Sequence, residues 1–450
     1  MTDGSKELSV EKGVMEVIII GAGLGGLATA LSCVQNGLKV QVFEKTPEIL
    51  PIGAGIQIPP NGVRALRYLG VDDKVQSSGA VAVQAGNLRS YKDGRNLLRR
   101  AGGEAYVRDY GAPWYVIHRA DYHRFLYDET IRRGVRTHLG VEIESVDFTI
   151  DQASVTTKSG QKFYGDVVVG ADGLWSKTRS LLLQHDASPM ATGDMAYRAT
   201  FTVEQLQSLN NEKLNALIKT PETNVWMGPN SHAVLYSVKG GSVYNLVLVC
   251  PDTLPPGFST IQGDVKEMQS AFSGWDPMLT DVLGLVSHVL KWRLCHNDEL
   301  LRWTKGNVVI IGDASHPTLP YQAQGAAMAV EDGAILGHLL GRLGKSASSG
   351  QIPEKLSIPH ILKMFEQLRK HRTTVNVRGA INNQRLFHMP DGPGRDERDR
   401  ILGQTNWETQ TPTVFSWNNL EYQRNMLSFD FIADADCAFD KFVQGEVARL

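Results

Sequence analysis

The sequence is poor in cysteine and contains no paired cysteines. Only four of its 450 residues are cysteine, and no two of them form a Cys-x-x-Cys pair. This spacing excludes a redox dithiol and gives no sign of a cysteine-based metal site, so we expect no bound metal. Four reduced thiols are typical of an intracellular protein. The cysteines are Cys33, Cys250, Cys295 and Cys437.

The chain also lacks a long apolar segment and a large excess of either charge. Its first 13 residues are polar, unlike a signal peptide, and no apolar run is long enough to span a bilayer. The 46 basic residues nearly balance the 48 acidic ones, which argues against a nucleic-acid partner. We therefore expect a cytoplasmic protein without a membrane partner. The ending Ala448-Arg449-Leu450 is a relaxed form of the Ser-Lys-Leu signal, which leaves the peroxisome as an alternative.

Glycine, by contrast, is abundant, and its first cluster follows an apolar run at residues 17–20. Helical spacing continues to Gln35, and a second apolar run ends near Glu44 and Lys45. This strand–turn–helix–strand pattern predicts a dinucleotide site. Gly21 permits the tight turn, Gly23 lets a pyrophosphate approach and Gly26 lets the helix pack closely. Glu44 can accept hydrogen bonds from ribose hydroxyls, and we assign Lys45 to the same cofactor end.

Two later apolar runs, at residues 166–173 and 307–313, also end in a glycine and an aspartate. Together with the first run they predict one parallel sheet. Alternating segments between about 190 and 290 predict an inserted antiparallel sheet, with a hairpin turn at residues 239–242. A long helix is expected from Pro359 to Phe387, followed by a mostly irregular tail. The predicted cofactor-binding domain is discontinuous and comprises residues 14–75, 105–188 and 290–385. The predicted substrate domain comprises residues 76–104 and 189–289. Residues 386–450 form the predicted C-terminal tail.

Three of these segments, in this order, resemble the FAD-dependent aromatic hydroxylases, which include salicylate hydroxylase and para-hydroxybenzoate hydroxylase. They are the glycine turn, the Asp-Gly motif at residues 170–179 and the Gly-Asp motif at residues 312–328. The resemblance covers about residues 16–387. It implies an α/β fold in which a Rossmann-type FAD-binding domain carries the inserted β-sheet domain. It also implies transient binding of NADH or NADPH as reductant, and a C4a-hydroperoxyflavin that transfers oxygen to the substrate.

The Gly-Asp motif is expected to hold the flavin half of the cofactor. Asp313 follows a buried strand, where its carboxylate can accept hydrogen bonds from ribityl hydroxyls. Gly325 and Ala326 begin a helix whose N–H groups can face the N1–C2=O edge of the flavin, where negative charge develops on reduction. The resemblance places Pro320 near the flavin carbon that reacts with oxygen.

Further cofactor contacts come from the resemblance alone. It implies that Asp172 serves both FAD and the nicotinamide cofactor, and that Arg119 contacts FAD. It also implies that the loop containing Gly55 and Gln57 runs past the flavin, so that Gln57 can face the ring or the substrate. A second glycine turn of the same type is absent from the sequence, in agreement with a reductant that binds only transiently.

Candidate catalytic residues lie in the inserted domain. Arg198 belongs to a Tyr-Arg pair like that of salicylate-hydroxylase-like enzymes, and it is our candidate anion anchor; the alternative is a structural ion pair. His232 and Tyr236 lie four apart on a predicted strand, so they share one face. His232 could act as base and Tyr236 as its orienting partner. A buried histidine bonded to backbone and plain core packing of Tyr236 are the alternatives.

The sequence therefore predicts a single-component monooxygenase that uses O2 to hydroxylate a small aromatic substrate, phenolic or an aromatic acid. With a salicylate-type substrate, decarboxylation could accompany hydroxylation. The alternative substrates are a nitrogen heterocycle and a polyketide- or indole-derived metabolite. The Trp-x-Trp-x-Ile-Pro segment of flavin halogenases is absent. A non-catalytic flavin-binding protein would not need Arg198, His232 and Tyr236. Monomer and homodimer both remain open.

Overall fold

The protein is described by a computed structural model that covers residues 14–50, 53–149, 152–348, 357–405 and 419–445. The ending Ala448-Arg449-Leu450 lies outside these residues. None of the described helices is long and apolar enough to cross a bilayer. All four cysteines are unpaired; Cys437 is exposed and the other three are buried.

A six-stranded sheet holds the predicted glycine turn and both later motifs. Its strands pair in parallel, except for the short antiparallel edge strand β19. The residues of β12 and most of β1 are buried because both faces of the sheet are covered, which explains their continuous apolar runs. The prediction of one parallel sheet is confirmed. In spatial order the strands are β19 (Thr304–Lys305), β20 (Val308–Ile310), β12 (Val167–Gly170), β1 (Glu16–Ile20), β2 (Lys39–Glu44) and β8 (Arg136–Leu139).

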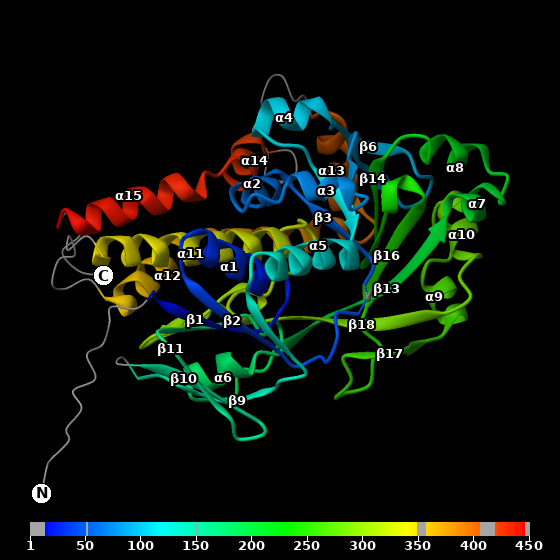
Figure 1. The fold of residues 1–450 in the computed structure, drawn as a ribbon. Helices are drawn as coiled ribbons and strands as arrows, with labels where there is room; N and C mark the ends of the chain where they lie inside the picture. The colour runs from blue at the N-terminus through cyan, green and yellow to red at the C-terminus, as the bar shows by residue number, and fades with distance from the viewer. Residues whose placement is uncertain (1–13, 51–52, 150–151, 349–356, 406–418, 446–450) are drawn as a thin grey trace, which may run out of the picture.

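Helices cover one side of this sheet and a small sheet lies on the other (Figure 1). On the helical side, α1 (Leu24–Gln35) packs along α11 (Gly325–Ser348), and α12 (Ile358–Phe387) packs on α11. The predicted long helix is therefore confirmed as α12. The small antiparallel sheet consists of β11 (Lys162–Gly165), β10 (Ala153–Thr157) and β9 (Ile143–Asp147).

An eight-stranded, mostly antiparallel sheet forms the second unit. Its strands β15 and β16 are joined through the 3-10 turn η1 (Lys239–Gly241), as the predicted hairpin requires. Strand β5 joins β14 in parallel and so brings residues near 85–101 into this sheet. The spatial order is β17 (Thr260–Gly263), β18 (Val289–His296), β13 (Met190–Thr202), β16 (Val243–Pro251), β15 (Ser231–Val238), β14 (Glu222–Gly228), β5 (Ala85–Ser90) and β6 (Asn96–Ala101).

Strand β18 corrects the predicted domain boundary. We expected the cofactor-binding domain to resume at residue 290, but β18 pairs with β13 and β17 inside the eight-stranded sheet. One inward position of β18 carries Lys291, which is buried and ion-paired with Glu267. A charged residue at an inward position disguises the alternation from which a strand is predicted.

The C-terminal segment corrects a second expectation. Instead of a mostly irregular tail, the structure has α13 (Pro393–Gly403), α14 (Leu420–Leu427) and α15 (Phe431–Val443). Phe431, Ala435 and Phe439 lie four apart and are buried, and α15 packs on α11 and α12. The proline- and glycine-rich break near residues 390–394 hid this helical spacing from the sequence-based prediction.

The remaining elements connect or cover the two units. A three-stranded sheet of β3 (Gly55–Ile58), β7 (Tyr115–His118) and β4 (Val81–Ala82) lies between them, and β3 and β7 both contact β15. The other helices are α2 (Pro60–Tyr68), α3 (Asp73–Ser77), α4 (Glu104–Tyr110), α5 (Arg119–Arg132), α6 (Lys177–Leu183), α7 (Val203–Gln207), α8 (Glu212–Leu217), α9 (Val265–Ala271) and α10 (Pro277–Leu283).

Candidate active site

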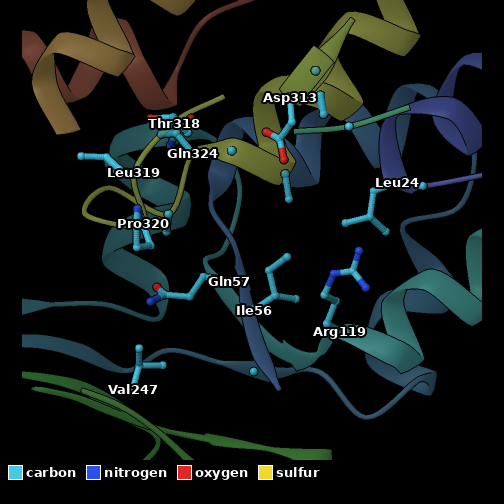
Figure 2. A pocket seen from close by; sticks show the side chains of 18 of the residues that line it. Leu24, Ile56, Gln57, Arg119, Val247, Asp313, Thr318, Leu319, Pro320 and Gln324 are labelled. Atoms are coloured by element: carbon cyan, nitrogen blue, oxygen red, sulfur yellow. The ribbon is translucent and has the colours of Figure 1, made fainter. Parts of the chain in front are cut away.

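A cavity of about 430 Å³ lies where the parallel sheet, the β3 loop and the eight-stranded sheet meet (Figure 2). Its size falls in the range of small-molecule sites. Eleven of the sixteen predicted site residues line it: Gly23, Gly55, Gln57, Arg119, Arg198, His232, Tyr236, Asp313, Pro320, Gly325 and Ala326. The five that do not are Gly21, Gly26, Glu44, Lys45 and Asp172.

The glycine turn has the backbone that the dinucleotide prediction requires. Gly21 has φ +105°, and a Cβ added at Gly26 would collide with the Gly21 carbonyl oxygen. Gly23 faces open space, with no atom within 4 Å of the position of an added Cβ. Helix α1 has no side-chain cap at its N-terminus and no acidic residue in its first turn. Its first N–H groups are therefore available to a phosphate.

Glu44 lies beside this turn, at the end of β2. Its Oε2 accepts a hydrogen bond from the Ala22 N–H at 2.9 Å, and its Oε1 accepts from the N–H and hydroxyl of Thr46. Burial opposes ionisation, but the Thr46 and Ala22 donors hold the pKa of Glu44 below its usual value. Glu44 is thus an ionised acceptor beside the glycine turn. Lys45 is exposed and adds positive charge nearby.

The Gly-Asp motif forms the opposite wall. Strand β20 leads into η2 (Gly312–Ala314), and the side chain of Asp313 opens onto the cavity. Enclosure by protein raises the pKa of the Asp313 carboxyl group, although His316 and Arg119 oppose this rise. Figure 2 shows Asp313 and Arg119 projecting into the same open space from opposite sides. Thr318 adds a buried Oγ1 with no partner among the described residues.

A buried ion network that we did not predict from the sequence holds the Gly-Asp motif in place. Asp332 of α11 accepts hydrogen bonds from the Gly312 N–H at 2.9 Å, from His316 at 2.6 Å and from Arg369 of α12 at 2.6 Å. Burial opposes ionisation, but His316 and Arg369 lower the pKa of Asp332 to about 2. Arg369 also pairs with Glu331 at 2.8 Å. The network anchors the cofactor loop to two helices.

The Asp172 carboxylate binds residues of its own motif. Its oxygens accept hydrogen bonds from the Ser176 hydroxyl at 2.5 Å and from the N–H and hydroxyl of Thr178, at the start of α6. The buried Arg179, also in this motif, donates to the backbone oxygens of Asp313 and Ala314 at 3.3 Å. The Asp-Gly motif thus braces the Gly-Asp motif, while a direct contact of Asp172 with a cofactor stays a prediction.

The three candidate catalytic residues share one face of the eight-stranded sheet. His232 and Tyr236 lie on β15, and Arg198 lies on β13, two strands away across β16. The register places Arg198 opposite Val247, His232 opposite Val249 and Tyr236 opposite Asn245. The even spacing predicted one face, and all three residues line the cavity. Apolar valines of the same face separate them: Val234, Val247 and Val249.

The β3 loop closes tightly over this face. The Gly55 N–H donates to Asn245 Oδ1 at 2.9 Å. A Cβ added at Gly55 would lie 2.5 to 2.8 Å from atoms of the Tyr236 ring and hydroxyl, so only glycine fits there. Two residues on, Gln57 lines the cavity while its Oε1 accepts a hydrogen bond from Trp114 Nε1 at 2.8 Å. Gly55 therefore serves close approach, bringing the β3 loop against the substrate-side sheet.

Arg119 and Arg198 place two positive charges in the cavity. Neither Arg119 nor Arg198 has a side-chain hydrogen bond or ion pair within the part of the chain that the structure describes. Burial, and after it the charge of Arg198, lowers the pKa of Arg119, and Asp313 opposes this. The structural ion pair considered for Arg198 is therefore not formed with a described residue. Two unpaired guanidinium groups favour an anionic ligand.

These features fit a flavin dinucleotide. The open Gly23 and the uncapped α1 terminus would take the pyrophosphate, Glu44 the adenosine ribose and Asp313 the ribityl chain. The N-terminus of α11 at Gly325 and Ala326 would face the flavin ring.

Comparison with known proteins agrees with this site. A family model described as "FAD binding domain" matches residues 14–352. The chain is 39% identical to the FAD-dependent monooxygenase OpS4 of Beauveria bassiana, covering 94% of this chain and 97% of that protein. It is 31% identical to 3-hydroxybenzoate 6-hydroxylase of Polaromonas naphthalenivorans, covering 89% and 94%. A solved structure described as a salicylate hydroxylase substrate complex shares the fold, with a TM-score of 0.77 at 23% identity over 95% of this chain and 98% of that one.

The fold and the site define a flavoprotein, and the comparisons say which kind. The chain belongs to the FAD-binding family, and within it to the FAD-dependent aromatic monooxygenases. NADH or NADPH is the reductant typical of the family. The resemblance drawn from three motifs is confirmed.

Proposed function

We propose that this monooxygenase hydroxylates a phenolic aromatic acid, and that Arg198, His232 and Tyr236 hold and activate the substrate. The observation that carries the proposal is the shared sheet face, on which a cation, a base and a hydroxyl surround three valines inside the cofactor cavity. A flat ring fits against the valines, and its polar substituents find the three polar groups.

Arg198 is the proposed anchor for the carboxylate. Its guanidinium presents a planar fork that matches a carboxylate, and no described residue neutralises it. The substrates named for two of the similar proteins, 3-hydroxybenzoate and salicylate, each combine a carboxylate with a phenol. One anchor and one base are what such molecules require.

His232 is the proposed base for the phenol. Burial, and after it the neighbouring His388, keeps the pKa of His232 well below its usual value, so the ring is neutral near pH 7. A neutral imidazole can accept a phenolic proton, and the resulting phenolate is a more electron-rich ring. Bound FAD, once reduced by NADH or NADPH, would activate O2, and one of the two oxygen atoms would be transferred to such a ring. Burial raises the pKa of Tyr236 although Arg198 opposes this, so its hydroxyl stays protonated and can orient the substrate.

The experiment is a panel of aromatic acids with purified, FAD-loaded protein, O2 and NADH or NADPH. The panel contains 3-hydroxybenzoate, salicylate, a hydroxypyridine carboxylate and an indole carboxylate. We expect at least one acid with a hydroxyl on its ring to accelerate NAD(P)H oxidation and to appear as a hydroxylated product. If only compounds without a ring hydroxyl are converted, the proposed role of His232 is wrong.

The Arg198→Gln variant tests the anchor. With the active acid, we expect KM to rise at least about tenfold because a charged contact worth about 1.5–3 kcal/mol is lost. With the corresponding phenol that lacks the carboxylate, variant and parent should differ little. Arg385→Gln, a change on the exposed side of α12, is the control. An equal rise in KM with both compounds would contradict the proposed role of Arg198 as the carboxylate anchor.

A further inference from the structure

A line of three titratable side chains runs from the cavity toward the surface. His232 Nδ1 lies 2.8 Å from His388 Nε2, and His388 Nδ1 lies 3.7 Å from Asp194 Oδ2. His232 comes from β15, His388 directly follows α12 as its C-cap and Asp194 lies on β13. As whole residues, His232 is 2% exposed and Asp194 is 7% exposed, so both are buried, whereas His388 is partly exposed. Exposure therefore rises from His232 to His388, away from the cavity.

The neighbours of this line hold each member in place. The His232 ring packs against the rings of Tyr321 and Phe387, with centroids 5.0 and 5.4 Å away. Asp194 Oδ2 accepts hydrogen bonds from the Tyr321 hydroxyl and from Gln384 Nε2, each at 2.6 Å. Burial raises the pKa of Tyr321, so that hydroxyl remains a donor. The arrangement is set by packing from three separate elements.

The hydrogen bond between the two imidazoles places one proton between them. One of the two nitrogens must carry a hydrogen and the other must accept it. No described group hydrogen-bonds the other nitrogen of His232, Nε2, and this residue lines the cavity. The outer nitrogen of His388 faces Asp194 at a distance that one water molecule or a small ring movement can bridge. Each ring thus has one nitrogen toward the cavity and one away from it.

We propose that His388 and Asp194 complete a proton relay that carries the phenolic proton of the substrate from His232 to solvent. The inference rests on the proposed function of His232. The substrate O–H bond breaks as an N–H bond forms at His232 Nε2. The proton on His232 Nδ1 passes to His388 Nε2, and the proton on His388 Nδ1 leaves toward Asp194 and water. One proton enters the line, one leaves it, and both rings return to neutral.

Burial supports this role because it disfavours the protonated, charged form of both histidines. It is the main reason that the pKa values of both His232 and His388 lie below their usual value, and Asp194 offsets it in part for His388. A proton placed on His232 is therefore held weakly, and an outlet speeds its removal. In this account His388 is a positioning and transfer residue, since it touches His232 and not the substrate.

The His388→Gln variant separates transfer from orientation. Glutamine can hydrogen-bond His232 Nδ1 but cannot pass a proton along. We expect FAD content and substrate KM to stay near the parent values, while hydroxylation of the active acid from the panel slows at least about tenfold. In His388→Ala, which leaves room for a small base, added imidazole should restore part of the rate. His371→Gln and His371→Ala, at an exposed position of α12, are the matched controls.

The outcomes are distinct. Parent-like turnover in His388→Gln would overturn the relay and leave the proposed function standing. A loss of hydroxylation rate in both His388 variants with no response to imidazole would also overturn the relay. That result would show that His388 only supports the structure. If the parent enzyme converts no phenolic acid at all, the proposed function fails, and the relay fails with it.

Discussion

At the scale of single residues, the site depends on close approach between side chains and loops that are distant in sequence. Tyr236 reaches the β3 loop only because residue 55 is glycine, and the Gly55 N–H donates a hydrogen bond to the side chain of Asn245. The sequence correctly placed His232 and Tyr236 on one face because strand alternation is regular, whereas the position of Arg198 on the same face depends on strand pairing and comes from the structure. The partner of His232 was not predictable, because His388 is 156 residues away and no local pattern links the two.

Gly55→Ala tests this close approach. The added methyl group would meet the Tyr236 ring, which is itself buried among aromatic and aliphatic neighbours, so either the loop or the ring must shift. A misplacement of about 1 Å at a reacting centre can cost on the order of a hundredfold in rate. We expect turnover to fall at least about tenfold while FAD remains bound, measured by product formation and flavin absorbance.

Gly394→Ala is the matched control for this substitution. Gly394 has an ordinary φ, and no atom lies within 4 Å of the position of an added Cβ. It lies in α13, where alanine is also the better helix former. Turnover in Gly394→Ala should equal that of the parent. If Gly55→Ala is equally active, the loop does not need its present distance from Tyr236.

At the scale of elements, α11 and α12 form the rigid support of the cofactor loop. Glu331 and Asp332 of α11 are fully buried, and Arg369 of α12, also fully buried, pairs with both. The sequence showed both helices by their spacing, but it could not show this ion network. Pairing depends on which faces of α11 and α12 meet, and a charged residue inside a helix is most often predicted to face solvent.

The Arg369→Met variant tests whether this buried ion network supports the cofactor loop. Removing one member of a buried ion network leaves uncompensated buried charge, which costs about 3–5 kcal/mol. We expect the free energy of unfolding in urea to fall by that amount and FAD to be retained less well. Arg400→Met is the control, because Arg400 and Glu397 are about half exposed and ion pairs at such exposed positions contribute little to stability. Equal stability of the two variants would contradict the supporting role.

At the scale of the whole molecule, two sheets of different construction border the active-site cavity, and Figure 1 shows how the two sheets are arranged. The sequence predicted the parallel sheet well, since its strands are continuous apolar runs that end at glycine motifs. It predicted the extent of the second sheet less well, because Lys291 interrupts the apolar alternation of β18. It missed α15, whose role becomes visible only when Phe431 and Phe439 are seen packed on the long helices.

The most direct test of the central claim follows the fate of molecular oxygen. FAD-loaded protein is supplied with NADH or NADPH, the active phenolic acid from the panel and ¹⁸O2, and the product is analysed by mass spectrometry. The account predicts that the aromatic product carries one ¹⁸O atom on its ring and that this product is absent without flavin. A protein that folds fully without binding flavin, or a ring product that carries oxygen from water alone, would contradict it.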